Sequence, residues 1–595
     1  KADSRFIIYA DKIFNMNGLP WIKNKLSTSY RITNQMANFI NKCVLNFDRL
    51  NAVKEGDLVR YVICDVFDPE HGTNNKYSKK SYYDTYFPYE EVKRYLKIHP
   101  YDQIFILAPS VRNERSPIRL LANKLTAYKI PIYVPNNDEE TIDEDIIKGK
   151  VVFSTFHQVK GLERDAVIVF NFSESYYEFF NRNGDPSVCC NELYVAITRA
   201  RTHLTILHHY QDNFLKFVKP ANISKYCNFI RNKDIYKNKK FDSTLIKPYS
   251  VTELLKHLSS DVICTAMNFI NVIPINGITD RIDIDMKTKQ GDFFENVSEI
   301  TGTAIPSYFE YINTGKMSIH EKLCNDDVID QNTVCDSKGM EISSNDSYNK
   351  SYMFGDSNDN DSESEDDNKE INLYDLKEIS IEKVLILSNY YCAHMCQYNY
   401  KKNQITNYTW LKEDVLQKCL GRLEKRISKN AKHEFSLRYD SDELYKNKKY
   451  LAGAIDCVDT ETSSVWEFKC VEELKDEHYL QLSIYAFMLQ TEYMNSYEIE
   501  MEKVAKIKND AEKKLKEKNV LDKHKCIYKY FLLNILTDEV AQIEASYENL
   551  HSMVEYLILN KFNDSDEIND EQFLENIELI KKEYNVKKIV KKSSV

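Results

Sequence analysis

The sequence lacks the features that mark several large classes of protein. Its 595 residues include 14 cysteines, but they form no CxxC pair and no four-cysteine set with zinc or iron–sulfur spacing. There is no signal peptide and no apolar run long enough to cross a bilayer. We therefore expect reduced thiols in an intracellular protein that has no membrane partner.

Positive charge is also scarce for a protein that would bind nucleic acid. Lysine and arginine number 80 against 91 acidic residues, which gives a formal net charge of −11. An acidic stretch, 356–370, supplies much of that charge and can mask basic surfaces elsewhere. The net charge therefore does not exclude DNA as a partner.

A phosphate-binding loop is missing as well. No GxxxxGK[ST] occurs, because Gly149-Lys150 lacks the upstream glycine and a following Ser or Thr, and no acidic magnesium-binding box is present. The chain begins at Lys1 rather than Met, which leads us to expect a fragment or a processed product. We expect this chain alone not to hydrolyse ATP.

The N-terminal third alternates short apolar strands with helices. Thr33 is the expected N-cap of one helix and Pro117 the expected start of another. This alternation predicts an α/β domain with a parallel sheet that is covered on both faces. The predicted strands are 59–66, 103–109, 150–156, 165–170 and 202–207.

Composition shifts divide the chain into five parts. We expect a first domain over 1–218, a Lys- and Asn-rich linker over 219–245, and the helical start of a second domain over 246–321. The segment 322–372 is poor in large apolar residues and is expected to be a disordered acidic insert. Folded pattern resumes over 373–595.

Three segments of the first domain carry a family resemblance. LSTSYRITNQMANFIN (26–41), STFHQVKGLERDAVIV (154–169) and NELYVAITRARTHLTIL (191–207) occur in this order. They resemble motifs IV, V and VI of UvrD/Rep-like superfamily 1 DNA helicases. The resemblance implies a RecA-like second motor domain, ATP as cofactor, DNA as partner, and a first motor domain that is missing here. The opening KADSRFIIYAD resembles the sequence just after family motif III.

The same resemblance assigns residue roles. A guanidinium delivered from a neighbouring domain stabilises charge on a γ-phosphate, and a glutamate contacts the ribose. Tyr30 is expected to pack or to position its neighbours, and Arg201 is either a surface ion-pair partner or a ligand. The implied ATP-binding residues are Arg31, Glu163 and Arg199. The family loop that touches the single strand or relays the nucleotide state corresponds here to Thr155, His157, which is alternatively structural, and Lys160.

The second domain holds a constellation that its spacing explains. LAGAIDCV predicts a strand that ends in Asp456, and SVWEFK predicts a neighbouring strand that carries Glu467 and Lys469. Residues two apart on a strand share a face, so the acids and the lysine converge. Asp456 and Glu467 can hold Mg²⁺, with Mn²⁺ as an alternative, and Lys469 can orient the attacking water. On the following helix, Gln481 and Tyr485 share a face.

Together, GxxD, ExK and QLxxY resemble RecB-type PD-(D/E)XK nucleases, which implies a restriction-endonuclease-like α/β domain and Mg²⁺-dependent DNA cleavage. Glu434, in HEFSLRY, falls where that family often has an acidic residue, and is an auxiliary catalytic candidate. GTAIPSYFE (302–310) resembles the family's GTxxH helix, except that Pro306 replaces the histidine. Glu310 either substitutes for it or is a plain surface glutamate.

Two functions from different classes follow. The first is a helicase-nuclease of replication, recombination or repair that acts on single-stranded DNA or DNA ends. Its arrangement resembles the helicase-nucleases of large DNA viruses, which would place it in the nucleus or in a cytoplasmic viral factory. The second is a non-catalytic DNA-binding or scaffolding protein in which both sites are degenerate.

Overall fold

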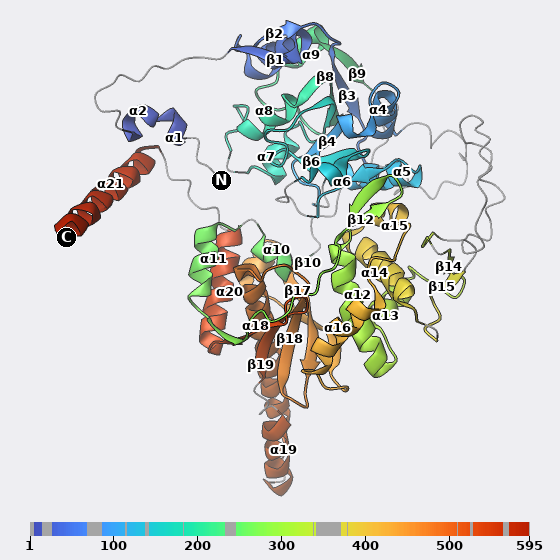
Figure 1. Ribbon diagram of the computed structural model, residues 1–595. Helices are drawn as coiled ribbons and strands as arrows, with labels where there is room; N and C mark the ends of the chain where they lie inside the picture. The colour runs from blue at the N-terminus through green and yellow to red at the C-terminus, as the bar shows by residue number, and fades with distance from the viewer. Residues whose placement is uncertain are drawn as a thin grey trace.

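The computed structural model describes residues 5–14, 27–67, 86–112, 116–136, 142–182, 184–231, 246–256, 258–336, 338–340, 370–377, 379–507, 510–523, 528–562 and 570–593. Two α/β domains follow one another along the chain (Figure 1). We call residues 27–231 the N-terminal domain and residues 246–562 the C-terminal domain. No helix in these ranges is both long and apolar enough to span a membrane.

The N-terminal domain is built on a seven-stranded sheet with the order β5-β6-β4-β7-β8-β3-β9. All of its strand pairs are parallel, as the alternation of strands and helices predicts. Successive residues of β3 enter opposite faces, so Tyr61 and Val62 belong to two different apolar cores. The strands are β3 (Val59–Cys64), β4 (Ile104–Ala108), β5 (Ile132–Tyr133), β6 (Val151–Thr155), β7 (Arg164–Val169), β8 (Ala200–His209) and β9 (Cys227–Arg231).

The helices of this domain cover the sheet. Thr33 accepts a hydrogen bond from the Met36 N–H and caps α3, as predicted. Pro117 is the N-cap of α5 rather than its first residue. A separate parallel pair, β1 (Thr28–Thr33) and β2 (Asn51–Lys54), precedes the sheet. The helices are α3 (Asn34–Phe39), the π-helical η1 (Ile40–Leu45), α4 (Phe87–Leu96), the 3₁₀-helical η3 (Tyr101–Gln103), α5 (Ile118–Ala127), α6 (Glu144–Ile147), α7 (Ser175–Phe179), α8 (Asn191–Ile197) and α9 (Pro220–Tyr226).

The predicted linker at 219–245 is wrong over its first part. Residues 220–231 form α9 and β9, and β9 pairs in parallel with β3 at the edge of the sheet. Ile223 and Cys227 are buried in the core there. Because polar side chains occupy the exposed positions of this segment, its composition resembles that of a linker although its apolar residues are buried. Residues 232–245 lie outside the described residues.

The C-terminal domain has a mixed sheet with the order β10-β17-β18-β19-β20-β11, and β16 also pairs with β17. The β17–β18 pair is antiparallel, whereas β18–β19 is parallel. The strands are β10 (Lys247–Ser250), β11 (Asn271–Asn276), β16 (Lys432–Tyr439), β17 (Lys449–Asp459), β18 (Ser464–Lys469), β19 (Lys529–Asn534) and β20 (Glu539–Glu544). Two antiparallel strand pairs lie outside this sheet: β12 (Lys287–Gln290) with β13 (Phe293–Asn296), and β14 (Val334–Cys335) with β15 (Ile371–Asn372).

Helices pack on both faces of this sheet. The Ser250 side chain closes a capping box with Glu253 at the start of α10. Gly315, at φ 71°, ends α12 in the left-handed conformation. The helices are α10 (Val251–Leu255), α11 (Ser260–Met267), α12 (Ser298–Thr314), α13 (Ser318–Asn325), α14 (Ile381–Cys396), α15 (Tyr400–Gln404), α16 (Glu413–Glu424), α17 (Asp442–Lys446), α18 (Asp476–Ala505), α19 (Asp510–Lys523) and α20 (Tyr547–Phe562).

The predicted disordered insert at 322–372 is wrong at its start. Residues 322–336 continue α13 and reach β14, and Leu323, Ile329 and Cys335 are buried in the C-terminal core. These few apolar residues are enough to fix the segment because α14 packs against α13. Residues 341–369 lie outside the described residues.

The two ends of the chain form a third group of helices. The short helices α1 (Arg5–Ile8) and α2 (Ala10–Ile13) pack against α21 (Asp570–Ser593), with Phe6 edge-on to Phe573. In Figure 1 these helices stand beside the two domains. They contribute none of the candidate site residues.

Candidate functional sites

Two strands bring the carboxylates and the lysine of the C-terminal domain together. Asp456 lies on β17, one step beyond the Cys457–Trp466 pair, and Glu467 and Lys469 lie on β18. The Lys469 Nζ donates to Glu467 Oε1 at 2.8 Å, and the backbone N–H of Phe468 donates to Asp456 Oδ2 at 2.6 Å. Trp466 and Phe468 are buried on the opposite face, in the core.

Helix α18 completes this cluster. The Lys469 Nζ also donates to Gln481 Oε1 at 3.0 Å, and Gln481 Nε2 donates to the Tyr485 hydroxyl at 3.3 Å. Gln481 and Tyr485 are one helical turn apart, so both reach the same strand end. A single hydrogen-bonded chain therefore runs from Glu467 to Tyr485. We call Asp456, Glu467, Lys469, Gln481 and Tyr485 the carboxylate–lysine cluster.

Gly453 leaves the space that Tyr485 fills. A Cβ atom at position 453 would lie 2.5 Å from Tyr485 Cε1, and Tyr485 is buried. We expect Gly453→Ala to lower the free energy of unfolding by about 1–3 kcal/mol, because the ring has no open space to enter. Chemical denaturation measures this. Gly421→Ala in α16 is the matched control, since its Cβ meets nothing within 4 Å and alanine favours a helix. A Gly453→Ala variant as stable as Gly421→Ala would contradict this account.

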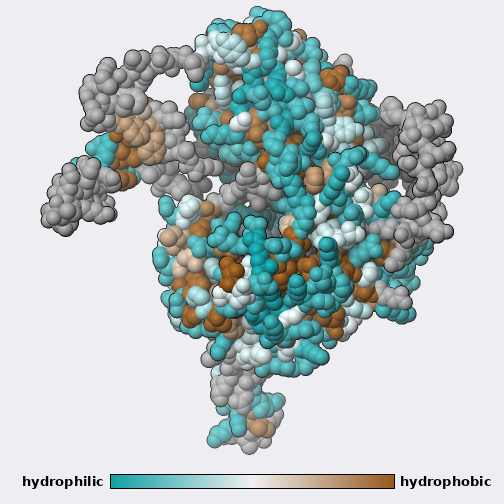
Figure 2. Space-filling model, viewed as in Figure 1, coloured by the Kyte–Doolittle hydropathy of each residue, from teal (hydrophilic) through white to brown (hydrophobic). Residues whose placement is uncertain are grey.

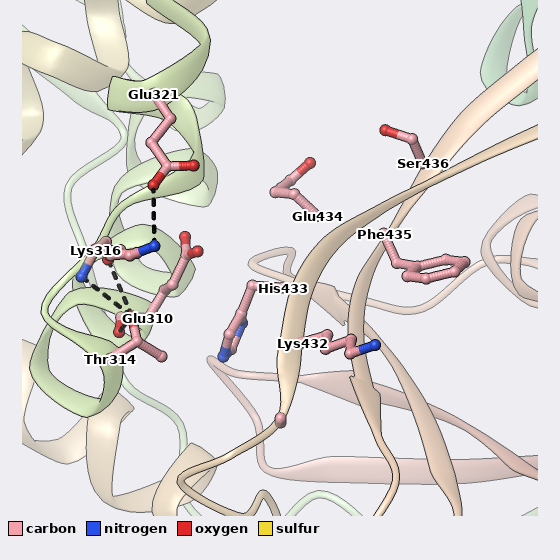
Figure 3. A pocket seen from close by; sticks show the side chains of 10 residues that line it. Glu310, Thr314, Lys316, Glu321, Lys432, His433, Glu434, Phe435 and Ser436 are labelled. Carbon is pink, nitrogen blue, oxygen red and sulfur yellow. Dashed lines mark hydrogen bonds and ion pairs between the residues drawn. The ribbon is translucent and has the colours of Figure 1, made fainter.

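Glu434 has an unusual backbone conformation within its strand. Along β16, His433 pairs with Cys457 and Phe435 with Ile455, so the unbroken register puts Glu434 opposite Asp456, and Glu434 has φ 49°. Positive φ is rare for a residue other than glycine and gathers at functional sites. Figure 3 shows that His433 and Glu434 both project toward the helices, whereas Phe435 points the other way.

A pocket of about 370 Å³ lies between β16 and the α12–α13 turn (Figure 3). Its ionisable lining residues are three glutamates, two lysines and one histidine, so the pocket contains groups of both signs of charge. The lining residues are Glu310, Thr314, Lys316, Glu321, Ala431, Lys432, His433, Glu434, Phe435 and Ser436.

Glu310 is not the plain surface glutamate of our second alternative. It is buried, and its carboxylate accepts bonds from the Ser318 N–H at 2.8 Å and the Ser318 hydroxyl at 2.6 Å. It therefore holds the start of α13 against the end of α12. Pro306 lies inside α12, which continues unbroken around it.

Crowding of like charges shapes the protonation of this region. Burial, together with Glu467 and Glu310, raises the pKa of Glu434 to about 7. Burial and the neighbouring Glu467 raise the pKa of Asp456, and Lys469 opposes that shift. The Glu467 carboxylate in turn raises the pKa of Lys469 against the opposing effect of burial, so the lysine remains charged. Such a group of acids favours an added positive charge.

The donor atoms suit a hard divalent cation. Glu467 is buried, and its Oε2 has no hydrogen-bond partner within the described structure. Carboxylate oxygens are the ligands that Mg²⁺ prefers, often only one or two of them alongside water and substrate phosphates. Among the described residues, no group of three or more His, Cys, Asp or Glu side chains that could hold a metal ion is present.

His478 helps to cap the N-terminus of α18, the helix that carries Gln481, and we expect this cap to depend on pH. Its Nδ1 accepts the Lys475 N–H at 3.1 Å, and burial lowers its pKa to about 4. The unfolded chain binds this proton at a higher pH than the folded chain. The stability is therefore present above about pH 6.5 and is lost as the pH falls toward 4. We expect His478→Asn to reduce the acid-induced drop in melting temperature between pH 7 and pH 5. An unchanged drop would contradict this role.

A second cluster lies in the N-terminal domain, where β1, β7 and α8 meet. Arg31 Nε contacts Glu163 Oε2 at 2.5 Å, and Arg31 also donates to the Thr198 carbonyl at 3.3 Å. Arg199 donates to the carbonyls of Val195 and Leu162. The three implied nucleotide contacts, Arg31, Glu163 and Arg199, are thus brought together. We call them the arginine cluster.

The members of the arginine cluster differ in exposure. The side chains of Arg31 and Glu163 are 34% and 38% exposed, whereas Arg199 is buried. Arg201 pairs with Asp165 at 2.9 Å, in line with the ion-pair alternative. Tyr30 is 73% exposed, so the packing alternative is wrong, and the positioning alternative stays a prediction. Its side chain extends from β1 into solvent.

The implied DNA loop divides into buried and exposed residues. Thr155 is fully buried, and its hydroxyl accepts the Gln158 N–H at 3.2 Å. It closes the turn after β6, so its side chain is not available to contact DNA directly, and the alternative that this loop relays the nucleotide state stays a prediction. His157 and Lys160 are exposed on the same turn, and Gly161 has φ 93°.

Two further residues near the carboxylate–lysine cluster escaped sequence reasoning. His433 lines the pocket and contacts Phe309 edge-on. Tyr391 of α14 feels the charges of Glu434 and Asp456, which, added to burial, raise its pKa. Tyr391 is about forty residues before Glu434, and only the packing of α14 brings it near, so no local pattern could have identified it.

Comparisons with known proteins bear on the N-terminal domain. Residues 134–211 match the UvrD-like helicase C-terminal domain family. Among solved structures, the C-terminal domain of a possible DNA helicase from Lactobacillus plantarum WCFS1 matches at 19% identity and a TM-score of 0.22, covering 34% of this chain and 99% of that one. No curated protein matches the chain. Residues 134–211 are thus similar to a UvrD-like helicase C-terminal domain.

Proposed function

We propose that this chain combines the second motor domain of a UvrD-like DNA helicase with a metal-dependent DNA nuclease of the PD-(D/E)XK type. The observation that carries the nuclease proposal is the Glu467–Lys469–Gln481–Tyr485 chain, with Asp456 beside it. The buried Glu467 Oε2 has no hydrogen-bond partner within the described structure, and a bound cation would compensate its charge. A purely structural core has no need of such an oxygen.

The residues of the cluster divide the work. Asp456 and Glu467 would hold Mg²⁺, which when bound polarises the scissile phosphate and stabilises the leaving oxygen. The ammonium of Lys469 has three N–H donors, and Glu467 and Gln481 accept two of them. The third can donate to a water molecule and orient it toward phosphorus. Gln481 and Tyr485 fix the orientation of that ammonium, so they are positioning residues.

The arginine cluster is one wall of a nucleotide site in this proposal. Arg31 and Arg199 would stabilise charge on the γ-phosphate, and Glu163 would contact the ribose. The Arg31–Glu163 ion pair would have to open for both contacts to form. The phosphate-cradling loop would come from a first motor domain, since this chain has no GxxxxGK[ST].

DNA is the proposed substrate of both sites. Lys160 and His157 are exposed beside the arginine cluster and can contact a strand through phosphates or base stacking. Replication, recombination or repair, and a viral source with nuclear or viral-factory localisation, stay proposals.

Cleavage of DNA by the purified chain tests this function. We expect single-stranded DNA, or duplex DNA with ends, to be cut in Mg²⁺ without ATP, because the carboxylate–lysine cluster is complete without a nucleotide. Chelation by EDTA should stop the reaction, and Mn²⁺ should restore it. Intact DNA in both metals, with binding retained, would favour the other function below.

A non-catalytic DNA-binding or scaffolding role is the second candidate. It is favoured by the lack of a gathered metal site among the described residues and by Pro306 where a histidine is usual in the resembled nucleases. In that case the Lys469–Glu467 pair serves stability alone.

A further inference from the structure

The edge of the N-terminal sheet is covered by a side chain of the C-terminal domain. Strand β5 lies at one end of the sheet, where its backbone would otherwise face solvent. Gln404 of α15 accepts the Ile132 N–H at 2.7 Å and donates to the Ile132 carbonyl at 2.9 Å. Its amide thus satisfies both backbone groups of the edge residue, as one more strand would.

A buried ion pair crosses between the domains beside that edge. The side chain of Lys150, at the start of β6, is 0% exposed, and that of Glu295, on β13, is 2% exposed. Lys150 Nζ donates to Glu295 Oε1 at 2.5 Å and to the Phe294 carbonyl at 2.6 Å. Gln404 Nε2 donates to the same Glu295 oxygen at 2.8 Å. Burial of a charge without its partner is costly, so each domain depends on the other here.

Two tyrosines extend the contact into the N-terminal core. Tyr398 and Tyr400 are buried among residues of β4, α5 and β6, as part of the same apolar cluster. The Tyr398 hydroxyl donates to the Val111 carbonyl, and the Tyr400 hydroxyl donates to the Val134 carbonyl at 3.0 Å. Figure 1 shows β12 and α15 against α5 and α6 at this place. Polar groups at both ends of the contact are therefore satisfied across it.

We propose that these residues form a permanent docking surface that makes the two domains one rigid body. We call it the seam, and it comprises Ile132 and Lys150 on one side and Glu295, Tyr398, Tyr400 and Gln404 on the other. Domains of one chain move independently unless their interface is large and well packed. A fully buried ion pair and two tyrosines inside the neighbour's core meet that condition. If the proposed function holds, the carboxylate–lysine cluster moves together with the arginine cluster.

Polar residues predominate on the face shown in Figure 2. Tyr398 and Tyr400, the apolar part of the seam, are buried and do not form an open patch for another protein. Its natural occupant is the C-terminal domain itself, which already fills it.

Cleavage of the single covalent link between the domains tests the seam. A protease site inserted between 236 and 241 lets the full chain be cut after folding. We expect the two pieces to remain together in gel filtration at micromolar concentration. Phe573→Ala, which removes the ring contact with Phe6 between α21 and α1, should not release them. Pieces that separate in the parent chain would overturn the proposal.

A double-mutant cycle then tests the ion pair within the seam. Lys150→Met leaves Glu295 buried and unpaired, so we expect the dissociation constant of the cut pieces to rise by about a hundredfold. Adding Glu295→Gln removes that charge and keeps an acceptor for Gln404, so most of the loss should be recovered. Gln404→Ala, in the C-terminal piece, should weaken association about tenfold and serves if Lys150→Met fails to fold. Unchanged association in Lys150→Met and Gln404→Ala would also overturn the proposal.

Discussion

Lys469→Met is expected to abolish DNA cleavage by this chain, with a loss of about 10³-fold or more. Methionine keeps the length of the side chain but cannot donate to Glu467, to Gln481 or to a water molecule. Asp456→Asn should cause a similar loss, because it removes one of the two carboxylates that would hold the metal. Initial rates on labelled single-stranded DNA in Mg²⁺ measure both effects.

Lys529→Ala is the matched control for these variants. Lys529 is exposed on β19 and pairs with Ser464, at the opposite end of β18 from Lys469. The Lys529→Ala variant should cleave DNA at the rate of the parent chain, because the carboxylate–lysine cluster lies at the other end of β18. Melting curves must show that Lys469→Met and Asp456→Asn remain folded. Rates near the parent value in either folded variant would refute the nuclease assignment.

Arg199→Ala is expected to lower ATP turnover by about 10³-fold once a first motor domain is supplied, with a smaller effect on nucleotide affinity. Its guanidinium would act on charge that develops only in the transition state. This chain alone should hydrolyse no ATP, even with single-stranded DNA, because it lacks the phosphate loop. Steady-state phosphate release measures turnover, and titration with a non-hydrolysable nucleotide measures affinity.

Arg60→Ala is a suitable comparison for Arg199→Ala. Arg60 is largely buried on β3 and pairs with Glu91 of α4, which is not part of the arginine cluster. It should reduce stability more than turnover. Two outcomes would contradict the assigned role of Arg199: ATP hydrolysis by the contaminant-free chain alone, or equal turnover in both variants.

Local periodicity was sufficient for most of the fold. The short apolar runs of β4 and β6 are bounded by polar segments, so they are recognised as buried strands. Thr33 caps α3 through its own side chain. The period of two on β18 also placed Glu467 and Lys469 on one face, opposite Trp466 and Phe468. These inferences depend on neighbours within a few residues.

The misses share the opposite cause, because each depends on contacts that are distant in sequence. Thr155 is turned inward by Gln158 and the packed turn after β6. The left-handed backbone of Glu434, at φ 49°, interrupts the period of two, so His433 and Glu434 share a side that alternation assigns to only one of them. Gln404 reads as an ordinary polar helix residue until β5 is seen beside it.

Binding of Mn²⁺ to the purified full chain, followed by electron paramagnetic resonance, tests most directly whether Asp456 and Glu467 form a metal site. The measurement requires neither DNA nor turnover. The account predicts saturable binding that Asp456→Asn and Glu467→Gln weaken strongly, that Lys469→Met retains, and that Mg²⁺ displaces. Binding that is absent from the parent chain, or that is unaffected by the two carboxylate substitutions, would contradict it.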